Sequence, residues 1–220
     1  MVINMKYELV IFDLDGTLLD TLDDLTRAVN HALGLQGFPL RTRDEVRHLI
    51  GNGIASTMRR AIPENSNDEV FRRALSDFRD YYLSHVNEYT HPYSGIPDLL
   101  NAMCSAGIRA AVNSNKVDTA TQALCKAHLP GKLALVMGEQ PDIPKKPAPD
   151  GALQIMQALG ARREGTLYVG DGETDIQTAA NAGIDCAWVA WGYRKASELG
   201  DLAIPHAFAS VRELENFILR

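Results

Sequence analysis

The sequence predicts an α/β fold: a doubly wound parallel sheet with a helical bundle, of the four-helix type, inserted after the first strand. From residue 96 onward helical patterns alternate with short apolar runs, a βαβ rhythm that builds parallel sheets with right-handed crossovers. Residues 20–89 hold helical patterns only. We therefore expect a sheet-bearing core domain from residues 1–19 and 93–220 and a helical domain from residues 20–92.

Composition is typical of a folded protein. The chain has 220 residues, 45% of them hydrophobic and 23% charged, which suffices for a core domain with a smaller insertion. A net charge of −6 without any basic block argues against nucleic acid as a partner. Three scattered cysteines predict neither a disulfide framework nor a zinc site. Since no segment resembles a signal peptide or a membrane span, we expect a cytoplasmic monomer or homodimer without a membrane partner.

The first predicted strand is the apolar run at residues 9–12. Two acids, Asp13 and Asp15, follow it, and Gly16 turns the chain directly afterwards. Ligand sites in open α/β sheets lie just outside the carboxyl ends of strands. One carboxylate there can attack or bind a metal while the other handles a proton. An acidic loop that caps the next helix would explain one of these acids but not both.

The inserted segment is predicted from periodicity and capping. Apolar residues recur at helical spacing over 22–33, and a second stripe over 71–82 is more typical of core than of a ligand platform. Two capping boxes predict further helix starts, at Thr42 with Glu45 and at Ser66 with Glu69. The two connections to the sheet, near 18–21 and 91–95, are candidate hinges.

The remaining elements follow in order. Helices are predicted over 96–106, 119–128, 150–159 and 176–182, and strands over 108–112, 133–137, 166–169 and 187–190. Gly107, Gly160 and Gly183 stand where three of these helices should end. A proline-rich loop spans 140–149.

Polar residues of the kinds that phosphoryl transfer needs follow the strands. They are Asp13 and Asp15; Ser114 with Asn115 and Lys116; Lys146; and Asp171 and Asp175 after Gly170. The carboxyl ends of parallel strands gather at one edge of a sheet, so we expect these side chains to meet there.

The order of these motifs resembles the haloacid dehalogenase superfamily. The matching segments are DLDGTL at 13–18, Ser-Asn-Lys at 114–116, Lys-Pro-x-Pro at 146–149 and Gly-Asp-x-x-x-Asp at 170–175. The helical insertion resembles the class with an α-helical cap, and the chain is most similar to the phosphoglycolate phosphatase-like branch. The similarity extends from about residue 7 to the strand before Gly192. It implies a Rossmann-like core and phosphatase activity.

Three residues are assigned to the reaction. Asp13 is the expected nucleophile, forming an aspartyl-phosphate that splits one hard hydrolysis into two easier steps. Asp15 is the expected general acid and base, which protonates the leaving oxygen and then activates water. Lys146 offers a point charge to the nucleophile and the phosphate oxygens. Its neighbour Lys145 is expected to be solvated, because Lys146 directly precedes the proline as in the family pattern.

A metal is expected beside the nucleophile. A carboxylate that attacks an anionic phosphate needs their repulsion cancelled, and Mg²⁺ does this with oxygen ligands. Carboxylates of Asp13 and Asp171 and the backbone carbonyl of Asp15 can supply them, and the resemblance implies the same set. Asp175 is expected to orient a metal-bound water or Lys146, with stabilisation of a helix N-terminus as the alternative.

Phosphate binding is assigned to polar groups around the two acids. These are the Ser114 hydroxyl and amide, Asn115, and N–H groups of Gly16 and Thr17 turned inward as an anion nest. Taken alone, Ser114 is more typical of a helix cap. Gly172 stands where the family often has Ser or Thr, a change that removes a hydroxyl but no metal ligand.

Two segments keep two interpretations each. Gly51-Asn52-Gly53 follows a helical pattern and is no dinucleotide fingerprint. Asn52 and Gly53 could touch the substrate from the cap, and a plain helix–helix turn is an equal alternative. Residues 191–194 are interpreted as a surface loop rather than as a border of the site.

The leading hypothesis is a Mg²⁺-dependent phosphatase of a small phosphate monoester, with 2-phosphoglycolate as the first candidate. Presence of the acid Asp15 argues against halide displacement. An inorganic pyrophosphatase or a β-phosphoglucomutase-like phosphoryl transferase of the same architecture is the alternative. A catalytically inert, partner-binding regulator is a third hypothesis, and the complete set of acids and lysine argues against it.

Overall fold

The computed structural model describes residues 6–220. Its centre is a six-stranded parallel sheet with strand order β5-β4-β1-β6-β7-β8. The strands are β1 (Leu9–Phe12), β4 (Arg109–Val117), β5 (Leu135–Glu139), β6 (Thr166–Gly170), β7 (Asp185–Val189) and β8 (His206–Phe208). The predicted parallel sheet is confirmed, with β8 as a further edge strand that the sequence analysis did not identify.

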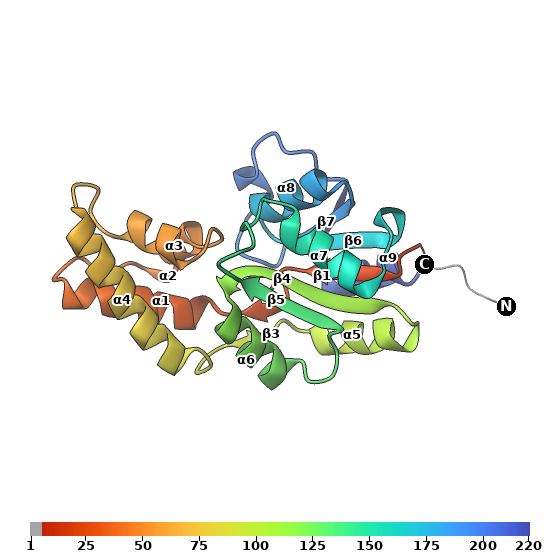
Figure 1. Cartoon of the computed structure of the whole chain (residues 1–220), viewed down its shortest axis with the longest axis horizontal. Helices are drawn as coiled ribbons and strands as arrows, with labels where there is room; N and C mark the ends of the chain where they lie inside the picture. Colours follow the sequence, from red (N-terminus) through yellow and green to blue (C-terminus); the bar gives the residue numbers. More distant parts are fainter. Residues whose placement is uncertain (1–5) are drawn as a thin grey trace.

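Each face of the sheet has its own hydrophobic core, because successive strand residues point to opposite faces. Val10 and Phe12 pack in one cluster, and Leu9 and Ile11 pack in another. The first cluster is covered by α5 (Ile96–Ser105), α6 (Asp118–His128) and α9 (Val211–Ile218), and the second by α7 (Asp150–Leu159) and α8 (Glu173–Ala182). Helices therefore cover both faces, and the doubly wound arrangement is confirmed (Figure 1).

Residues 22–85, here called the helical segment, form four helices at one end of the molecule (Figure 1). They are α1 (Leu22–Leu35), α2 (Arg43–Leu49), α3 (Ile54–Ala61) and α4 (Asp68–His85). These helices share a separate hydrophobic cluster that buries Phe78 and Tyr82. Ala120 and Tyr193 join this cluster, so the helical segment packs against the sheet-bearing part there.

The capping predictions for the helical segment have different outcomes. Thr42 and Glu45 form the expected capping box of α2. The prediction for Ser66 is wrong, because Asn67 caps α4 instead. The Asn67 side chain accepts hydrogen bonds from the N–H groups of Glu69 and Val70 at 3.1 and 3.0 Å. Asn is an equally good N-cap residue, and its position directly before Asp68 starts the helix one residue later.

The two connections between the helical segment and the sheet pair with each other. β2 (Leu19–Asp20) and β3 (His91–Pro92) form a two-stranded antiparallel ribbon. The buried Asp24 carboxylate accepts hydrogen bonds from the N–H groups of Tyr89 and Thr90, each at 3.0 Å, just before β3. The candidate hinges thus lie in a paired ribbon rather than in two free linkers.

β4 extends to Val117, whereas the sequence predicted an end at Val112. The four polar residues at 113–116 form part of the strand and are all buried. The register against β5 shifts between Asn113 and Val117, a bulge that lets the strand continue.

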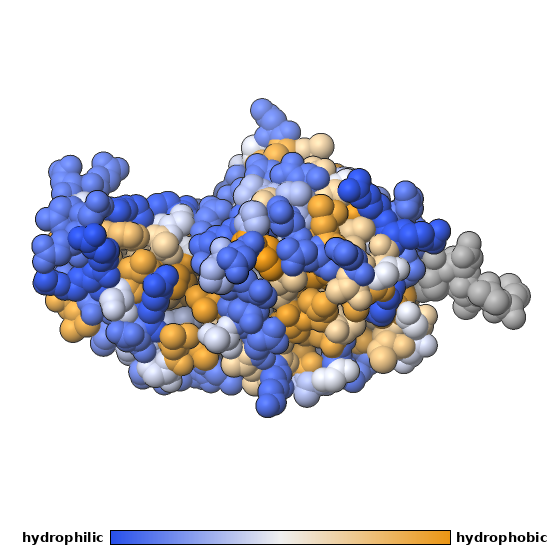
Figure 2. Space-filling model, in the orientation of Figure 1, coloured by the Kyte–Doolittle hydropathy of each residue, from blue (hydrophilic) through white to orange (hydrophobic). Residues whose placement is uncertain are grey.

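The surface view adds two features. The outer end of the helical segment is largely hydrophilic, and the outline is notched where this segment meets the sheet-bearing part (Figure 2). Among residues 6–220, no helix combines the length and apolar character that crossing a membrane requires.

Candidate active site

The acids predicted at separate strand ends do converge. Asp13 follows β1, Asp171 follows β6 and Asp175 lies in the first turn of α8. One carboxylate oxygen of each lies within 4.8 Å of the others. They border a pocket of about 60 Å³ between the sheet edge and the helical segment. The helical segment contributes apolar side chains to its wall, namely Leu25, Ile50 and Ile54.

Glycine makes room for this cluster. Gly16 has a φ of +84°, and a Cβ there would lie 2.5 Å from Oδ2 of Asp171. A side chain at Gly192 would also collide with Asp171. Any larger residue at either position would displace the carboxylate, so the two glycines hold the acid cluster together by lacking a side chain.

Lys146 joins the expected nucleophile to the cluster. Its Nζ lies 2.9 Å from Oδ1 of Asp13 and 2.7 Å from Oδ1 of Asp175, and its side chain is only 3% exposed. The other Asp175 oxygen accepts a hydrogen bond from the N–H of Gly172 at 3.1 Å. Lys145 is exposed and pairs with Glu139 at 2.8 Å. Lys146, rather than Lys145, is therefore the lysine in the site.

Asp15 has a separate lysine. Its Oδ2 lies 2.9 Å from Nζ of Lys116, and its Oδ1 accepts a hydrogen bond from Oγ1 of Thr21 at 2.7 Å. Nζ of Lys116 also donates to the hydroxyl of Tyr82, on α4, at 2.6 Å. Burial lowers the pKa of Lys116, but the Asp15 carboxylate and Tyr82 outweigh it and raise the pKa overall. The sequence pattern predicts Lys116 at a strand end without a partner, and it places Tyr82 in an apolar stripe typical of core.

The pocket holds more negative than positive charge. Five carboxylates (Asp13, Asp15, Asp171, Glu173 and Asp175) face three cationic side chains (Lys116, Lys146 and Arg194). Burial raises the pKa of Asp13 to about 7 despite the opposing effect of Lys146. Burial, together with the charges of Asp175 and Asp13, raises the pKa of Asp171 to about 8. A divalent cation with oxygen ligands would relieve this excess, so the donor set fits such an ion.

The N–H groups of Gly16 and Thr17 do not form the expected anion nest. Gly16 donates its N–H to the carbonyl of Leu19 at 2.9 Å, and Thr17 donates its N–H to the carbonyl of Leu14 at 3.3 Å. Both groups are therefore used inside the loop itself. The Thr17 hydroxyl instead donates to Oδ1 of Asp171 at 3.1 Å, which holds that carboxylate in place.

Ser114 and Asn115 both line the pocket, with different surroundings. Oγ of Ser114 accepts the N–H of Lys116 at 3.2 Å, and its hydroxyl proton can still be donated into the pocket. The Asn115 carboxamide accepts the N–H of Lys146 at 2.9 Å and donates to the carbonyl of Gly51 at 3.2 Å. Its side chain thus positions Lys146 and links the sheet edge to the helical segment, rather than pointing free toward a phosphate.

The loop at 51–53 reaches across to the sheet edge. Oδ1 of Asn52 accepts a hydrogen bond from Oγ1 of Thr174 at 3.2 Å, and Gly53 lines the pocket. A Cβ at Gly53 would lie 3.3 Å from Nζ of Lys145. The loop is therefore a contact between the two parts of the molecule and not merely a turn between α2 and α3.

The interpretation of residues 191–194 as a surface loop is wrong, because Tyr193 and Arg194 are buried at the border of the pocket. The N–H of Tyr193 donates to Oδ2 of Asp171 at 2.6 Å. The Arg194 guanidinium donates to the carbonyls of Arg47 and Ile50, at the end of α2, at 2.7 and 2.8 Å. A loop rich in small and aromatic residues gave no sequence signal for this contact.

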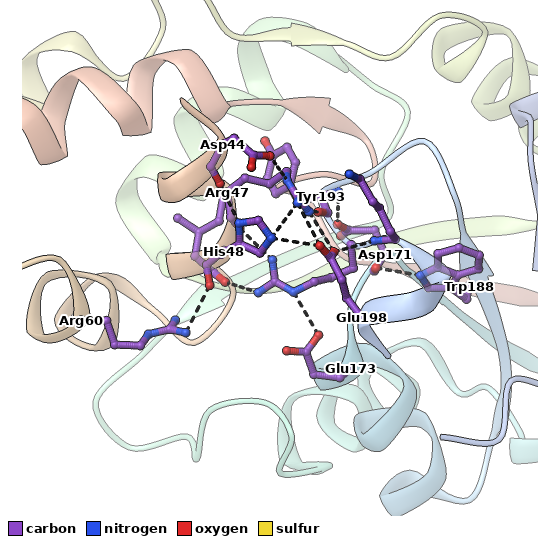
Figure 3. A network of polar contacts seen from close by, with 12 residues as sticks. Asp44, Arg47, His48, Arg60, Asp171, Glu173, Trp188, Tyr193 and Glu198 are labelled. Carbon is purple, nitrogen blue, oxygen red and sulfur yellow. Dashed lines mark hydrogen bonds and ion pairs between the residues drawn. The ribbon is translucent and has the colours of Figure 1, made fainter. Parts of the chain in front are cut away.

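A second contact joins α2 to the segment after β7, and in this contact α2 supplies the hydrogen-bond donors. Arg47 donates to both carboxylate oxygens of Glu198 at 2.9 Å, and His48 lies 2.9 Å from the same carboxylate (Figure 3). We call Arg47, Arg194 and Glu198 the α2 clasp. It holds the helical segment over the acid cluster.

The chain is similar to known proteins in both sequence and structure. A sequence profile of haloacid dehalogenase-like hydrolases matches residues 10–189. The chain is 32% identical to the phosphoglycolate phosphatase of Aquifex aeolicus, over 96% of this chain and 98% of that protein. It is 34% identical to that of Pseudomonas putida, over 84% of this chain and 70% of the relative. A crystal structure from Lactobacillus delbrueckii subsp. bulgaricus, named provisionally as a phosphoglycolate phosphatase, superposes with a TM-score of 0.93 at 34% identity, covering 97% and 99% of the two chains.

Proposed function

Since the chain belongs to the haloacid dehalogenase-like hydrolase family and is a phosphatase, we propose that it hydrolyses 2-phosphoglycolate or a closely similar small monoester through an aspartyl-phosphate on Asp13. The observation that carries the proposal is the pairing of two acids with two lysines at one sheet edge: Asp13 with Lys146, and Asp15 with Lys116. The names of the aligned relatives support the substrate.

Mg²⁺ is the proposed cofactor. The carboxylates of Asp13 and Asp171 and the backbone carbonyl of Asp15 would hold it, and the carboxylate of Asp175 lies close enough to orient its water. When bound, the ion supplies positive charge that reduces the repulsion between the phosphate and the carboxylates. The surplus of negative charge and the raised pKa values of Asp13 and Asp171 support this assignment.

The two acids divide the reaction between them. An oxygen of Asp13 forms a bond to phosphorus as the ester P–O bond breaks, and Asp15 donates a proton to the leaving oxygen. Water then attacks phosphorus and gives a proton to Asp15, while the bond between phosphorus and Asp13 breaks and inorganic phosphate leaves. Lys146 balances charge at Asp13 throughout, and the Ser114 hydroxyl is available to a phosphate oxygen.

Residues 20–92 would act as a cap domain on the core formed by residues 1–19 and 93–220. Closure of the cap would exclude water and strengthen electrostatic interactions inside the pocket. A pocket of about 60 Å³ favours a small organic group over a phosphoprotein. The α2 clasp would hold the closed arrangement, and the β2–β3 ribbon would guide opening.

The test is phosphate release from a panel of phosphate compounds in the presence of Mg²⁺: the esters 2-phosphoglycolate and a sugar phosphate, and the anhydride pyrophosphate. We expect selective turnover of 2-phosphoglycolate. Asp13→Asn should lose turnover, and Asp15→Asn should lower it on the order of 100- to 10,000-fold. Asp142→Asn, at an exposed loop position, is the matched control and should leave turnover unchanged.

Two results would contradict the proposal. Preferred turnover of pyrophosphate, or phosphoryl transfer to an acceptor sugar, would indicate one of the alternative activities. Turnover that survives in Asp13→Asn would exclude the covalent route.

A further inference from the structure

Lys116 is a buried cation of the pocket that makes and breaks no bond in the steps proposed above. Two basic side chains line the pocket wall, Lys116 and Arg194. The guanidinium of Arg194 is engaged by Glu173 and by the carbonyls of Arg47 and Ile50. An ammonium group has three N–H donors, and within residues 6–220 the partners of Lys116 are Asp15 and Tyr82. One donor of Lys116 is therefore left for a ligand.

The position of Lys116 is on the leaving-group side. Lys146 lies beside Asp13, where the phosphoryl group would be, whereas Nζ of Lys116 lies 2.9 Å from Asp15. Asp15 is the residue that would protonate the leaving oxygen, so the organic part of the substrate must lie next to it. A carboxylate one carbon away from the leaving oxygen would come within reach of the Lys116 ammonium.

The surroundings make this cation selective. The Lys116 side chain is only 3% exposed, and the Tyr82 hydroxyl fixes its ammonium from α4. Apolar side chains of Leu25 and Ile54 border the same pocket. A charge interaction is stronger in such surroundings than in water, so this ammonium would bind a carboxylate more tightly than an uncharged hydroxyl at the same place.

We propose that Lys116 selects phosphate monoesters that carry a carboxylate next to the ester oxygen. This inference rests on the proposed phosphatase function and names the residue that determines its specificity. Lys116 would bind the carboxylate of the organic half, while Lys146 serves the phosphoryl half.

The test compares two esters in each variant: 2-phosphoglycolate, and 2-hydroxyethyl phosphate, in which CH₂OH replaces the carboxylate. We expect the wild-type protein to prefer 2-phosphoglycolate in kcat/KM. Lys116→Met should lower that preference about 10- to 100-fold, the range for one charge-assisted hydrogen bond. Lys116→Arg should retain part of the preference, and Lys126→Met, at an exposed position of α6, should retain all of it.

The ratio of two substrates in one preparation does not depend on how much of the variant is folded. Loss of the Asp15 partner should slow both esters alike, because each releases the oxygen of a primary alcohol. Inhibition by glycolate should weaken in Lys116→Met, while inhibition by inorganic phosphate should not. An equal fall for both esters would overturn the inference and leave Lys116 as a positioning residue for Asp15. A wild-type protein that hydrolyses both esters equally would overturn the inference alone. Absence of Asp13-dependent hydrolysis of either ester would overturn the proposed function with it.

Discussion

At the scale of single residues, the site depends on which atoms approach one another at the sheet edge. Asp13 and Asp15 are separated by one residue, yet each has a different lysine, on a different segment of the chain. This separation would allow Asp13 to act as the proposed nucleophile while Asp15 exchanges protons. The identity of the acids follows from the sequence, because a buried apolar strand ends directly before them.

Gly16 offers a test of this close packing. Gly16→Ala would strain a backbone with a φ of +84° and would push Asp171 out of place. Gly37→Ala is the matched control, since its φ is +69° but a Cβ at that position would meet nothing within 4 Å. A left-handed conformation costs an alanine about 1–2 kcal/mol, so both variants should lose that much free energy of unfolding. Only Gly16→Ala should also lose Mg²⁺ binding, measured by calorimetry; equal Mg²⁺ affinity in the two variants would contradict the account.

At the scale of elements, the α2 clasp connects the helical segment to the loop after β7. In Arg47→Ala we expect a several-fold rise in KM for a small ester, because the helical segment closes less firmly over the pocket. A double-mutant cycle of Arg47→Ala with Glu198→Gln, read by urea unfolding, should give a coupling energy of about 1 kcal/mol. Arg73→Ala with Glu69→Gln, an exposed pair within α4, should couple weakly and leave KM unchanged. An unchanged KM in Arg47→Ala would contradict a role of the α2 clasp in substrate binding.

The sequence predicts elements well where one chemical signal dominates. The helix at 150–159 matches α7 in both bounds, and Gly160 in the left-handed conformation explains its C-terminal end. β4 is longer than predicted. Residues 113–116 are polar and border the site, and a run of four polar residues is more typical of a loop than of a buried strand. The α2 clasp could not be predicted, since it joins residues about 150 positions apart. Arg194 donates to backbone carbonyls, which carry no sequence signature, and Arg47 donates to one of many carboxylates in the chain. The contact between Tyr82 and Lys116 was concealed in the same way, because 34 positions separate these residues in the sequence.

At the scale of the whole molecule, the excess negative charge of the pocket links stability to pH and to metal. The pKa of an aspartate in an unfolded chain is about 3.9, whereas those of Asp13 and Asp171 in the folded, metal-free protein are about 7 and about 8. The folded state therefore holds more protons than the unfolded state between these values. The contribution to stability is complete below about pH 4 and is lost as the pH rises through 7 to 8.

The metal-free protein should thus lose free energy of unfolding between pH 5 and pH 8, by at most about 1.4 kcal/mol per pH unit for each of the two groups. Mg²⁺ favours the ionised carboxylates, so saturating Mg²⁺ should flatten this slope and raise stability most at the higher pH. Asp171→Asn should reduce the slope in the metal-free protein. Urea unfolding in EDTA and in Mg²⁺ across this range checks the prediction, and identical slopes with and without Mg²⁺ would contradict a metal site at these acids.

The most direct test of the central claim, a covalent phosphatase reaction at Asp13, is a rapid-quench experiment with the phosphorus-labelled ester that the protein hydrolyses fastest. In the presence of Mg²⁺ we expect a transient label on the peptide that contains Asp13, formed and lost at rates compatible with turnover. Asp13→Asn should give neither label nor phosphate. Release of phosphate at the full rate without a covalent label at any time would contradict the account.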